Sequence, residues 1–334
     1  MGSMLALLYA TTYPERVSKI LLTAAISYFF GITREIRILA PSDSITLNAW
    51  ICAQLGILSN KRGLNEEKRD KEQVMEQHPL DQVETLALKK KAAWDSGKFQ
   101  YLLRSIMASM FIGFGIVVAF KTGNLFDEGA SPFAYTSAAV TFGMAIILIG
   151  YAGGDLFTGN TFYFTFSTLR GSTTWMETLK IWGTSYLGNF IGALLFAALL
   201  WGTGLFHGYD SNVFFYHVVV HKMEVSTFQL FFRAILCNWL VCMAFFIPMT
   251  LKGDGPKIFA MILFVYGFFI SGFEHSIANM TSFSIALLME PPPGISLYGA
   301  LHNLIPVTFG NIIGGSVFMG MIYYYLNKRN RKKI

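Results

Sequence analysis

Two acidic side chains lie within long apolar stretches of the sequence, and each begins a similar hexapeptide. Asp155 opens Asp-Leu-Phe-Thr-Gly-Asn and Glu274 opens Glu-His-Ser-Ile-Ala-Asn, so that each acid is followed by an Asn, Asn160 or Asn279, at the same spacing. An ionisable group inside an apolar segment of membrane length is costly and is a candidate for function. A carboxylate can also accept hydrogen bonds from the N–H groups that an interrupted helix leaves free. We therefore expect these four residues to stabilise helix breaks.

The residue after the second acid, His275, has different chemistry. An imidazole can both donate and accept a proton near neutral pH. A His in an apolar segment is often only a satisfied core residue, but His275 lies at one interruption, opposite Thr158 at the other. This placement favours a functional role for His275.

The cysteines give no sign of metal or redox chemistry. Cys237 and Cys242 have C-x4-C spacing in an apolar stretch with no His nearby, and Cys52 stands alone. This pattern is typical of small buried side chains. We expect no metal site and no cofactor.

The composition indicates a membrane protein with several spans. Hydrophobic residues make up 53% of the 334 positions and charged residues 14%, whereas soluble domains carry about 25% charged residues. This balance argues against an ordinary soluble enzyme and against a disordered chain. The formal net charge of +6 comes mostly from a basic tail at 328–334. A basic tail directly after an apolar segment is typical of a cytoplasmic membrane flank, and it is not evidence for nucleic-acid binding.

Six apolar segments follow residue 98, and a helix needs about 20 apolar residues to cross a bilayer. They cover about 99–120, 134–169, 179–206, 226–250, 257–289 and 298–326. The second and fifth are the longest, and they are interrupted at Gly153-Gly154-Asp155 and Gly272-Phe273-Glu274. Lys and Arg in the connecting loops favour one side, which predicts that both termini are cytoplasmic. Arg233, near the opposite side, departs from this trend.

The third and sixth segments share a second motif. One contains Gly188-Asn189-Phe-Ile-Gly and the other Gly310-Asn311-Ile-Ile-Gly, 33 and 36 residues after the respective acids. Because three spans per half is an odd number, the two halves must have opposite orientations in the membrane. The sequence therefore predicts an all-α membrane protein of six transmembrane helices in two inverted three-helix repeats, with helices two and five broken.

These motifs resemble the formate/nitrite transporter family, and the formate channels of that family look closest. The resemblance extends over about 80–330 and is carried by 155–160, 188–189, 271–280 and 303–315. It implies an aquaporin-like protomer with its own pore, assembled as a homopentamer in the plasma membrane. It also implies six pore or substrate-binding residues, namely His275, Thr158, Ile146, Phe268, Lys222 and Asn238.

The resemblance implies transport of small monovalent anions of weak acids: formate or nitrite, with lactate and hydrosulfide as further candidates. A bare anion in a dry apolar constriction would cost several to tens of kcal/mol. Protonating an acid of pKa about 3.8 at pH 7 costs only about 4 kcal/mol. We therefore expect Lys222 and the half-helix N-termini to attract the anion. It would be neutralised near His275, by that residue or by water, and would cross the bilayer together with its proton.

Two alternatives belong to other classes. A neutral-solute channel of aquaporin type lacks support because paired Asn-Pro-Ala motifs are missing and His275 lies at the break. A membrane-anchored hydrolase is suggested by residues 1–30, which are similar to the segment after the nucleophile elbow of α/β-hydrolases. The nucleophile itself is missing from this segment, so we expect no enzyme activity.

The chain divides into four predicted parts. Residues 1–74 are an extra N-terminal segment, either a hydrolase-like remnant or a start-site artefact. Residues 75–98 form a cytoplasmic lead-in helix, 99–327 the transmembrane channel domain, and 328–334 the basic cytoplasmic tail.

Overall fold

The computed structural model describes residues 66–129, 131–289 and 291–327, and within these ranges it contains helices and no strands. The first helix, α4, covers Glu66–Ser96 and is followed directly by α5, Lys98–Asp127. The described part of the chain thus enters the lead-in helix before the predicted start at residue 75. Residues 1–65, which include the hydrolase-like stretch and Cys52, lie outside the described residues, as does the basic tail 328–334.

The six predicted apolar segments are all helical. Five stretches are long and apolar enough to cross a membrane: Lys98–Asp127, Ala134–Ala152, Trp175–Thr203, Thr227–Thr250 and Leu297–Asn327. The fifth predicted segment is divided between α12, Asp254–Ile270, and α13, Ser276–Leu288. Each of these helices is shorter than one span of about 20 residues, but end to end they approach the length of the interrupted second segment.

The second and fifth segments are broken, as predicted. The second consists of α6 (Ala134–Thr141), α7 (Met144–Ala152) and α8 (Phe157–Leu169). The α7–α8 break and the α12–α13 break are built alike: a glycine with positive φ, one further residue, the acid, and a new helix two residues after the acid. Gly153 has φ 87° and Gly272 has φ 67°, a left-handed conformation that only glycine adopts without strain.

The interruption between α6 and α7 was not predicted. It is a tight turn in which the Phe142 amide donates to the Ala138 carbonyl (3.0 Å) and the Ala145 amide donates to the Phe142 carbonyl (3.0 Å). The turn leaves the Phe142 ring buried among the helices. Because these local hydrogen bonds satisfy the backbone, the turn needs no polar side chain. The apolar sequence around it therefore shows no sign of the interruption.

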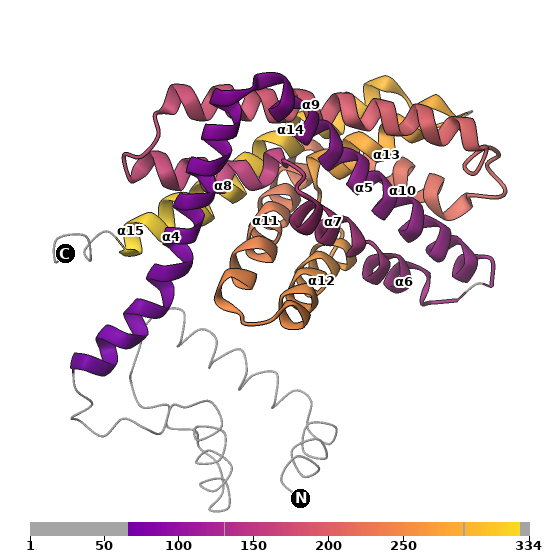
Figure 1. Ribbon diagram of the computed structural model, residues 1–334. Helices are drawn as coiled ribbons and strands as arrows, with labels where there is room; N and C mark the ends of the chain where they lie inside the picture. The colour runs from indigo at the N-terminus through magenta and orange to yellow at the C-terminus, as the bar shows by residue number, and fades with distance from the viewer. Residues whose placement is uncertain (1–65, 130, 290, 328–334) are drawn as a thin grey trace, which may run out of the picture. The chain divides into compact units, whose positions relative to one another are not determined.

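Equivalent helices pack together in the two halves. In the first half α5 lies along α9 (Trp175–Thr203), and in the second half α11 (Thr227–Phe246) lies along α14 (Leu297–Ile313) (Figure 1). Glycines of the shared motif allow both contacts, because a Cβ on Gly192 would overlap the carbonyl oxygen of Ile106, and one on Gly310 would overlap that of Phe231. Small residues at such positions let helix backbones approach closely in membranes.

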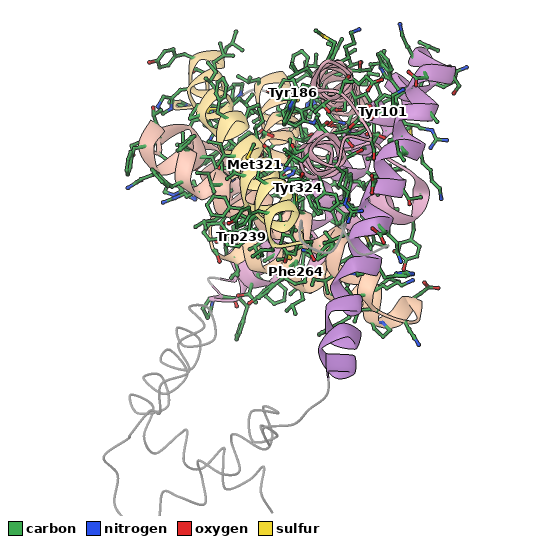
Figure 2. The ribbon with its side chains drawn as sticks, turned by 90° about the vertical axis from the view of Figure 1, so that its left-hand side faces the viewer. Tyr101, Tyr186, Trp239, Phe264, Met321 and Tyr324 are labelled. Carbon is green, nitrogen blue, oxygen red and sulfur yellow. The ribbon has the colours of Figure 1, made fainter. Side chains whose placement is uncertain are left out.

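The remaining elements complete the second half. After α14 the last span continues as η2 (Gly314–Met321), a π-helix, and α15 (Ile322–Asn327), and η2 packs against α8. Trp239 of α11 stacks on Phe318 with ring centroids 4.8 Å apart, and Figure 2 shows Trp239 beside the helix that carries Met321 and Tyr324. The short helix η1 (Ile247–Thr250) follows α11, and α10 (Val213–Glu224) precedes it. The contacts between η2 and α8 hold α8 next to the second half.

Candidate functional site

Asp155 is the centre of a hydrogen-bonded network at the first break. Its Oδ1 accepts hydrogen bonds from the Tyr101 hydroxyl (2.7 Å) and the Asn160 amide (2.6 Å), and its Oδ2 pairs with Lys90 Nζ (2.9 Å). Tyr101, labelled in Figure 2, comes from α5 and Lys90 from α4. A buried carboxylate is tolerated only when it is paired and hydrogen-bonded. Both oxygens of Asp155 have partners within the protein.

Glu274 has the same environment at the second break. Its Oε2 accepts hydrogen bonds from Lys222 Nζ (3.0 Å), the Asn279 amide (2.5 Å) and, at 3.5 Å, the Asn303 amide. The Glu274 side chain is 2% exposed and that of Lys222 is 18% exposed. Each half of the fold thus pairs its break acid with one lysine and with the Asn five residues after the acid. Asp155 and Asn160 thus lie at the first break, and Glu274 and Asn279 at the second.

The Asn of each Gly-Asn motif closes the break of its own half. Asn189 Oδ1 accepts from the Phe157 amide (3.0 Å), and Asn311 Oδ1 accepts from the Ser276 amide (2.8 Å). Each also donates through Nδ2 to the carbonyl oxygen of the acid in its half, at 3.0 Å in both cases. These contacts satisfy the first free N–H of the new helix. The repeat of the motif was visible in the sequence, but this role of its Asn was not predicted.

His275 and Thr158 meet across the two breaks. The distance from His275 Nε2 to Thr158 Oγ1 is 2.9 Å, and both side chains are buried. The other ring nitrogen, Nδ1, accepts a hydrogen bond from the Ala278 amide at 3.1 Å and so caps α13. Because a nitrogen that accepts an N–H cannot itself carry a proton, the neutral ring has its proton on Nε2 and donates it to Thr158.

The two residues are partners in space without being equivalent in the repeat. When the acids are aligned, His275 corresponds to Leu156, and Thr158 corresponds to Ile277. The sequence placed them opposite each other because both follow a break acid within a few residues. Their contact arises because the two breaks face each other in the middle of the fold.

Asn238 lies behind this pair. Its Nδ2 is within hydrogen-bonding distance of the Thr158 carbonyl (3.2 Å), the Thr161 hydroxyl (3.0 Å) and the Asn311 carbonyl (2.6 Å). It lines none of the three cavities described below. The structure therefore places Asn238 as a link between the two breaks; its pore or substrate-binding role, implied by the resemblance, stays a prediction.

Three cavities follow one another through the helix bundle. The α10-side cavity is lined by Ile116, Phe120, Tyr135, Phe142, Val218, Lys222, Phe268, Phe269, Phe273, His275, Ala278, Asn279 and Ser282. The central cavity is lined by Ile112, Phe142, Ala145, Ile146, Ile149, Leu156, Val241, Val265, Phe268 and His275. The α4-side cavity is lined by Leu86, Lys89, Lys90, Ala93, Arg104, Ile149, Gly150, Gly153, Gly154, Asp155, Leu156, Gly159, Tyr163 and Phe245.

Neighbouring cavities share lining residues, and we take the apolar ones among them as two constrictions. The α10-side and central cavities share Phe142, Phe268 and His275, and the two phenyl rings lie edge to face with centroids 6.1 Å apart. Ile149 and Leu156 separate the central cavity from the α4-side one. Ile146 lines the central cavity itself. Phe268 and Ile146 were expected from the resemblance, whereas the other three were not.

The wall of the central cavity has one polar side chain, His275. Phe268 stacks on its ring with centroids 6.1 Å apart and an interplanar angle of 25°. Lys222 lies at one end of the row of cavities and Lys90 at the other. The arrangement is therefore a lysine at each end, an apolar middle, and one imidazole within it.

Ion pairs hold α4 in the position that brings Lys90 to Asp155. Arg170 Nη1 contacts Asp81 Oδ1 and Glu84 Oε2, each at 2.6 Å, and Lys91 pairs with Glu177 at 3.1 Å and, within α4 itself, with Asp95 at 2.5 Å. Burial disfavours the charge of Arg170, but its two acidic partners outweigh this and raise its pKa. Lys90 was missed in the sequence because it sits in the run Lys89-Lys90-Lys91, which reads as a solvated face.

The cysteines of the described chain are buried. Cys237 and Cys242 both lie on α11, with free thiols and no exposed surface. No group of three or more His, Cys, Asp or Glu side chains within the described ranges could hold a metal ion. The cavities and their lysines are thus the features from which a function must be argued.

Comparison with known proteins gives a consistent answer. The family model described as "Formate/nitrite transporter" matches residues 80–325. The chain is 58% identical over 253 residues to an uncharacterized transporter, YwcJ, of Bacillus subtilis (strain 168), with 76% of this chain and 99% of that one covered. It is 37% identical over 233 residues to the nitrite transporter NirC of Escherichia coli (strain K12), with 69% and 85% covered.

A solved structure shows the same architecture. A pentameric formate channel with formate bound superimposes with a TM-score of 0.58 at 27% sequence identity, covering 71% of this chain and 98% of that chain. The matched part of our chain thus corresponds to nearly the whole of a single channel subunit.

Proposed function

This chain belongs to the formate/nitrite transporter family, and from that premise we propose that small anions cross its pore as neutral acids. The protein is a multi-pass membrane channel or transporter for small anions such as formate and nitrite. The observation that carries the proposal is the apolar central cavity with a single imidazole in its wall. Such a cavity admits a small neutral molecule and resists a charge.

A small acid can enter the central cavity as the bare anion or as the neutral acid. A bare carboxylate moved into an apolar cavity loses its hydration, at a cost of several to tens of kcal/mol. A carboxylic acid with a pKa near that of an Asp side chain, about 3.9, is protonated at pH 7 at a cost of about 4 kcal/mol. The neutral acid then meets only apolar walls and a hydrogen-bonding imidazole. Protonation before the constriction is therefore the cheaper route.

Lys222 and Lys90 attract the anion at the two ends of the pore. Each amino group is held at a cavity wall by the buried acid of its half, at 3.0 Å and 2.9 Å respectively. An ammonium group at a cavity wall still offers charge-assisted hydrogen bonds to an arriving anion when a carboxylate balances its charge. Neither lysine lines the central cavity, so the anion must be neutralised before it goes further.

The proton comes from water, and His275 stays neutral. Charging the ring would require a proton on Nδ1, where the Ala278 amide already donates at 3.1 Å. Charging would therefore break the cap of α13 and set two donors against each other. We infer that His275 offers its Nε2 proton as a hydrogen bond, first to Thr158 and then to the passing acid. This supports the water route over direct protonation by His275.

The surroundings follow from the same premise. We propose that the chain forms a homopentamer with one pore per subunit, as the superimposed formate channel is pentameric. Because Lys and Arg in the connecting loops of the sequence favour one side, we propose that both termini lie in the cytoplasm and that the chain spans the plasma membrane. We propose the channel domain at 99–327, after a lead-in helix at 75–98 and an extra segment at 1–74. Lactate and hydrosulfide are further weak-acid substrates to test.

A flux experiment tests the neutral-acid route. The full chain is reconstituted into liposomes, and uptake of formate and nitrite is followed by stopped flow between pH 5.5 and 7.5. We expect uptake at a fixed total concentration to fall about tenfold per pH unit, because the fraction of neutral acid falls by that factor. Uptake should proceed without net charge movement across the membrane. A flux that is independent of pH and generates a membrane potential would show that the anion itself crosses.

A further inference from the structure

The two ends of the pore differ in size and charge. The α4-side cavity has a volume of about 310 Å³, whereas the α10-side cavity has about 30 Å³. The floor of the larger cavity includes Gly153, where an added Cβ would meet nothing within 4 Å. The larger cavity can hold a solvated polyatomic ion, while the smaller one has space for about one or two water molecules.

The α4-side cavity also has an excess of positive charge. Lys89, Lys90 and Arg104 line it together with one acid, Asp155. Lys90 is paired with Asp155 at 2.9 Å, but neither Lys89 nor Arg104 has a side-chain hydrogen bond or ion pair among the described residues. Two positive charges therefore remain uncompensated. On the other side, the charge of Lys222 is balanced by Glu274.

We propose that the α4-side cavity is a binding site for a small doubly charged oxyanion of the sulfate or hydrogen phosphate class. Such an ion matches the two uncompensated charges of Lys89 and Arg104. Its attraction to each cation is twice that of a monovalent anion at the same distance. The cavity volume accommodates a tetrahedral oxyanion with part of its water.

The bound dianion closes the pore from this side. A dianion that takes up one proton still carries a negative charge, so it cannot use the neutral-acid route. The Ile149–Leu156 constriction therefore stops it. Because the α10-side cavity is smaller and electrically balanced, the block acts from one side of the membrane only. The block rests on the proposed transport function, whereas the binding does not, and the two are measured separately.

Binding is measured on the purified full chain in detergent by isothermal titration calorimetry with sodium sulfate, against sodium chloride at equal ionic strength. We expect sulfate to bind, and the double variant Lys89→Gln/Arg104→Gln to bind it about tenfold or more weakly, since two charge pairs with the oxyanion are lost. The matched control is Lys98→Gln: Lys98 lies over the Trp94 ring at 5.1 Å and lines none of the three cavities. Its sulfate binding should equal that of the unaltered chain. Absence of sulfate binding, or equal binding by the double variant, would refute the site.

Sidedness is measured by formate flux in vesicles that carry the chain in one orientation. Sulfate on the α4 side should inhibit formate flux in the unaltered chain and in Lys98→Gln, and the inhibition constant should rise about tenfold in the double variant. Sulfate on the α10 side should have no effect beyond that of ionic strength. Repeating the calorimetric titration with phosphate at pH 8, where the doubly charged form predominates, shows which of the two oxyanions binds more tightly. Sulfate binding without inhibition would refute the block, and a chain that binds sulfate but moves no formate would refute the transport proposal and leave the site standing.

Discussion

The lysine–acid pairs predict a separation between stability and transport that can be measured at Lys222. The Glu274 side chain is 2% exposed, so Lys222→Met leaves a buried carboxylate that is either uncompensated or forced to take up a proton. Removing one partner of a buried ion pair costs about 3–5 kcal/mol. The amides of Asn279 and Asn303 still reach Glu274, so we expect the lower end of that range, about 3 kcal/mol. With an unfolding entropy of about 2.1 cal/mol/K per residue, that loss lowers the melting temperature of the 334-residue chain by about 4 °C.

The double variant Lys222→Met/Glu274→Gln should recover most of this stability. Its Gln oxygen can still accept from the Asn279 amide, no charge is buried, and the residual loss is about 1 kcal/mol, the value of one ordinary hydrogen bond. Transport should not recover, because the ammonium donor at the cavity wall is gone. We expect formate uptake at low concentration to be about tenfold slower than in the unaltered chain, since a hydrogen bond to a charged group is worth about 1.5 kcal/mol.

The assay combines thermal unfolding in detergent with formate uptake by proteoliposomes. Lys180→Met, which removes an exposed lysine of α9, is the control and should change the melting temperature by less than about 1 °C. If Lys222→Met melts like the unaltered chain, the pair is not a buried ion pair. If the double variant melts as low as the single one, the loss is due to lysine packing and the reasoning about charge is wrong.

Three further predictions follow from other parts of the pore. Gly192→Ala should destabilise the chain by about 1–3 kcal/mol, since its Cβ would overlap a backbone carbonyl. Gly183→Ala on the same helix, where an added Cβ would meet nothing within 4 Å, should be neutral or slightly stabilising. Equal melting temperatures of the two variants would contradict this. His275→Asn should slow formate uptake at every pH but keep the tenfold fall per pH unit, because the proton comes from water; loss of that slope would show that His275 supplies it. Phe268→Ala should widen the constriction that it shares with Phe142 and admit lactate faster relative to formate, as measured by the ratio of their uptake rates; an unchanged ratio would move the selective point elsewhere.

The features that the sequence revealed are those whose chemistry is local. Asp155 and Glu274 stand out because a charge in an apolar segment needs a reason, and the glycines before them allow the chain to turn with positive φ. The matching Gly-Asn motifs indicated two halves, since both the close helix contact and the amide bridge need those residues at a fixed spacing. Broken helices and inverted repeats could therefore be read directly.

The features that it hid depend on distant contacts. Lys90 pairs with a residue 65 positions away, and its run of lysines has the composition of a solvated helix face. The amide of Asn238 lies within hydrogen-bonding distance of the backbone oxygens of Thr158 and Asn311, and the sequence pattern of side chains does not reveal contacts to carbonyl groups. Phe142 lies in the turn between α6 and α7, whose backbone groups bond to each other locally. The turn therefore needs no polar side chain, and the sequence around Phe142 does not reveal it.

The position where the two halves differ is the strongest argument for the role of His275. Its equivalent in the first half is Leu156, which precedes α8 without any side-chain cap, while Asn189 and Asn311 serve their half-helices in the same way. A helix can therefore start after a break without an imidazole, so scaffolding alone does not require His275. Both residues line the central cavity, one as an apolar wall and the other as its polar side chain. The fold repeats the groups that hold the two breaks together, and it differs at the position where, on the proposed route, a passing acid would find a hydrogen-bond partner.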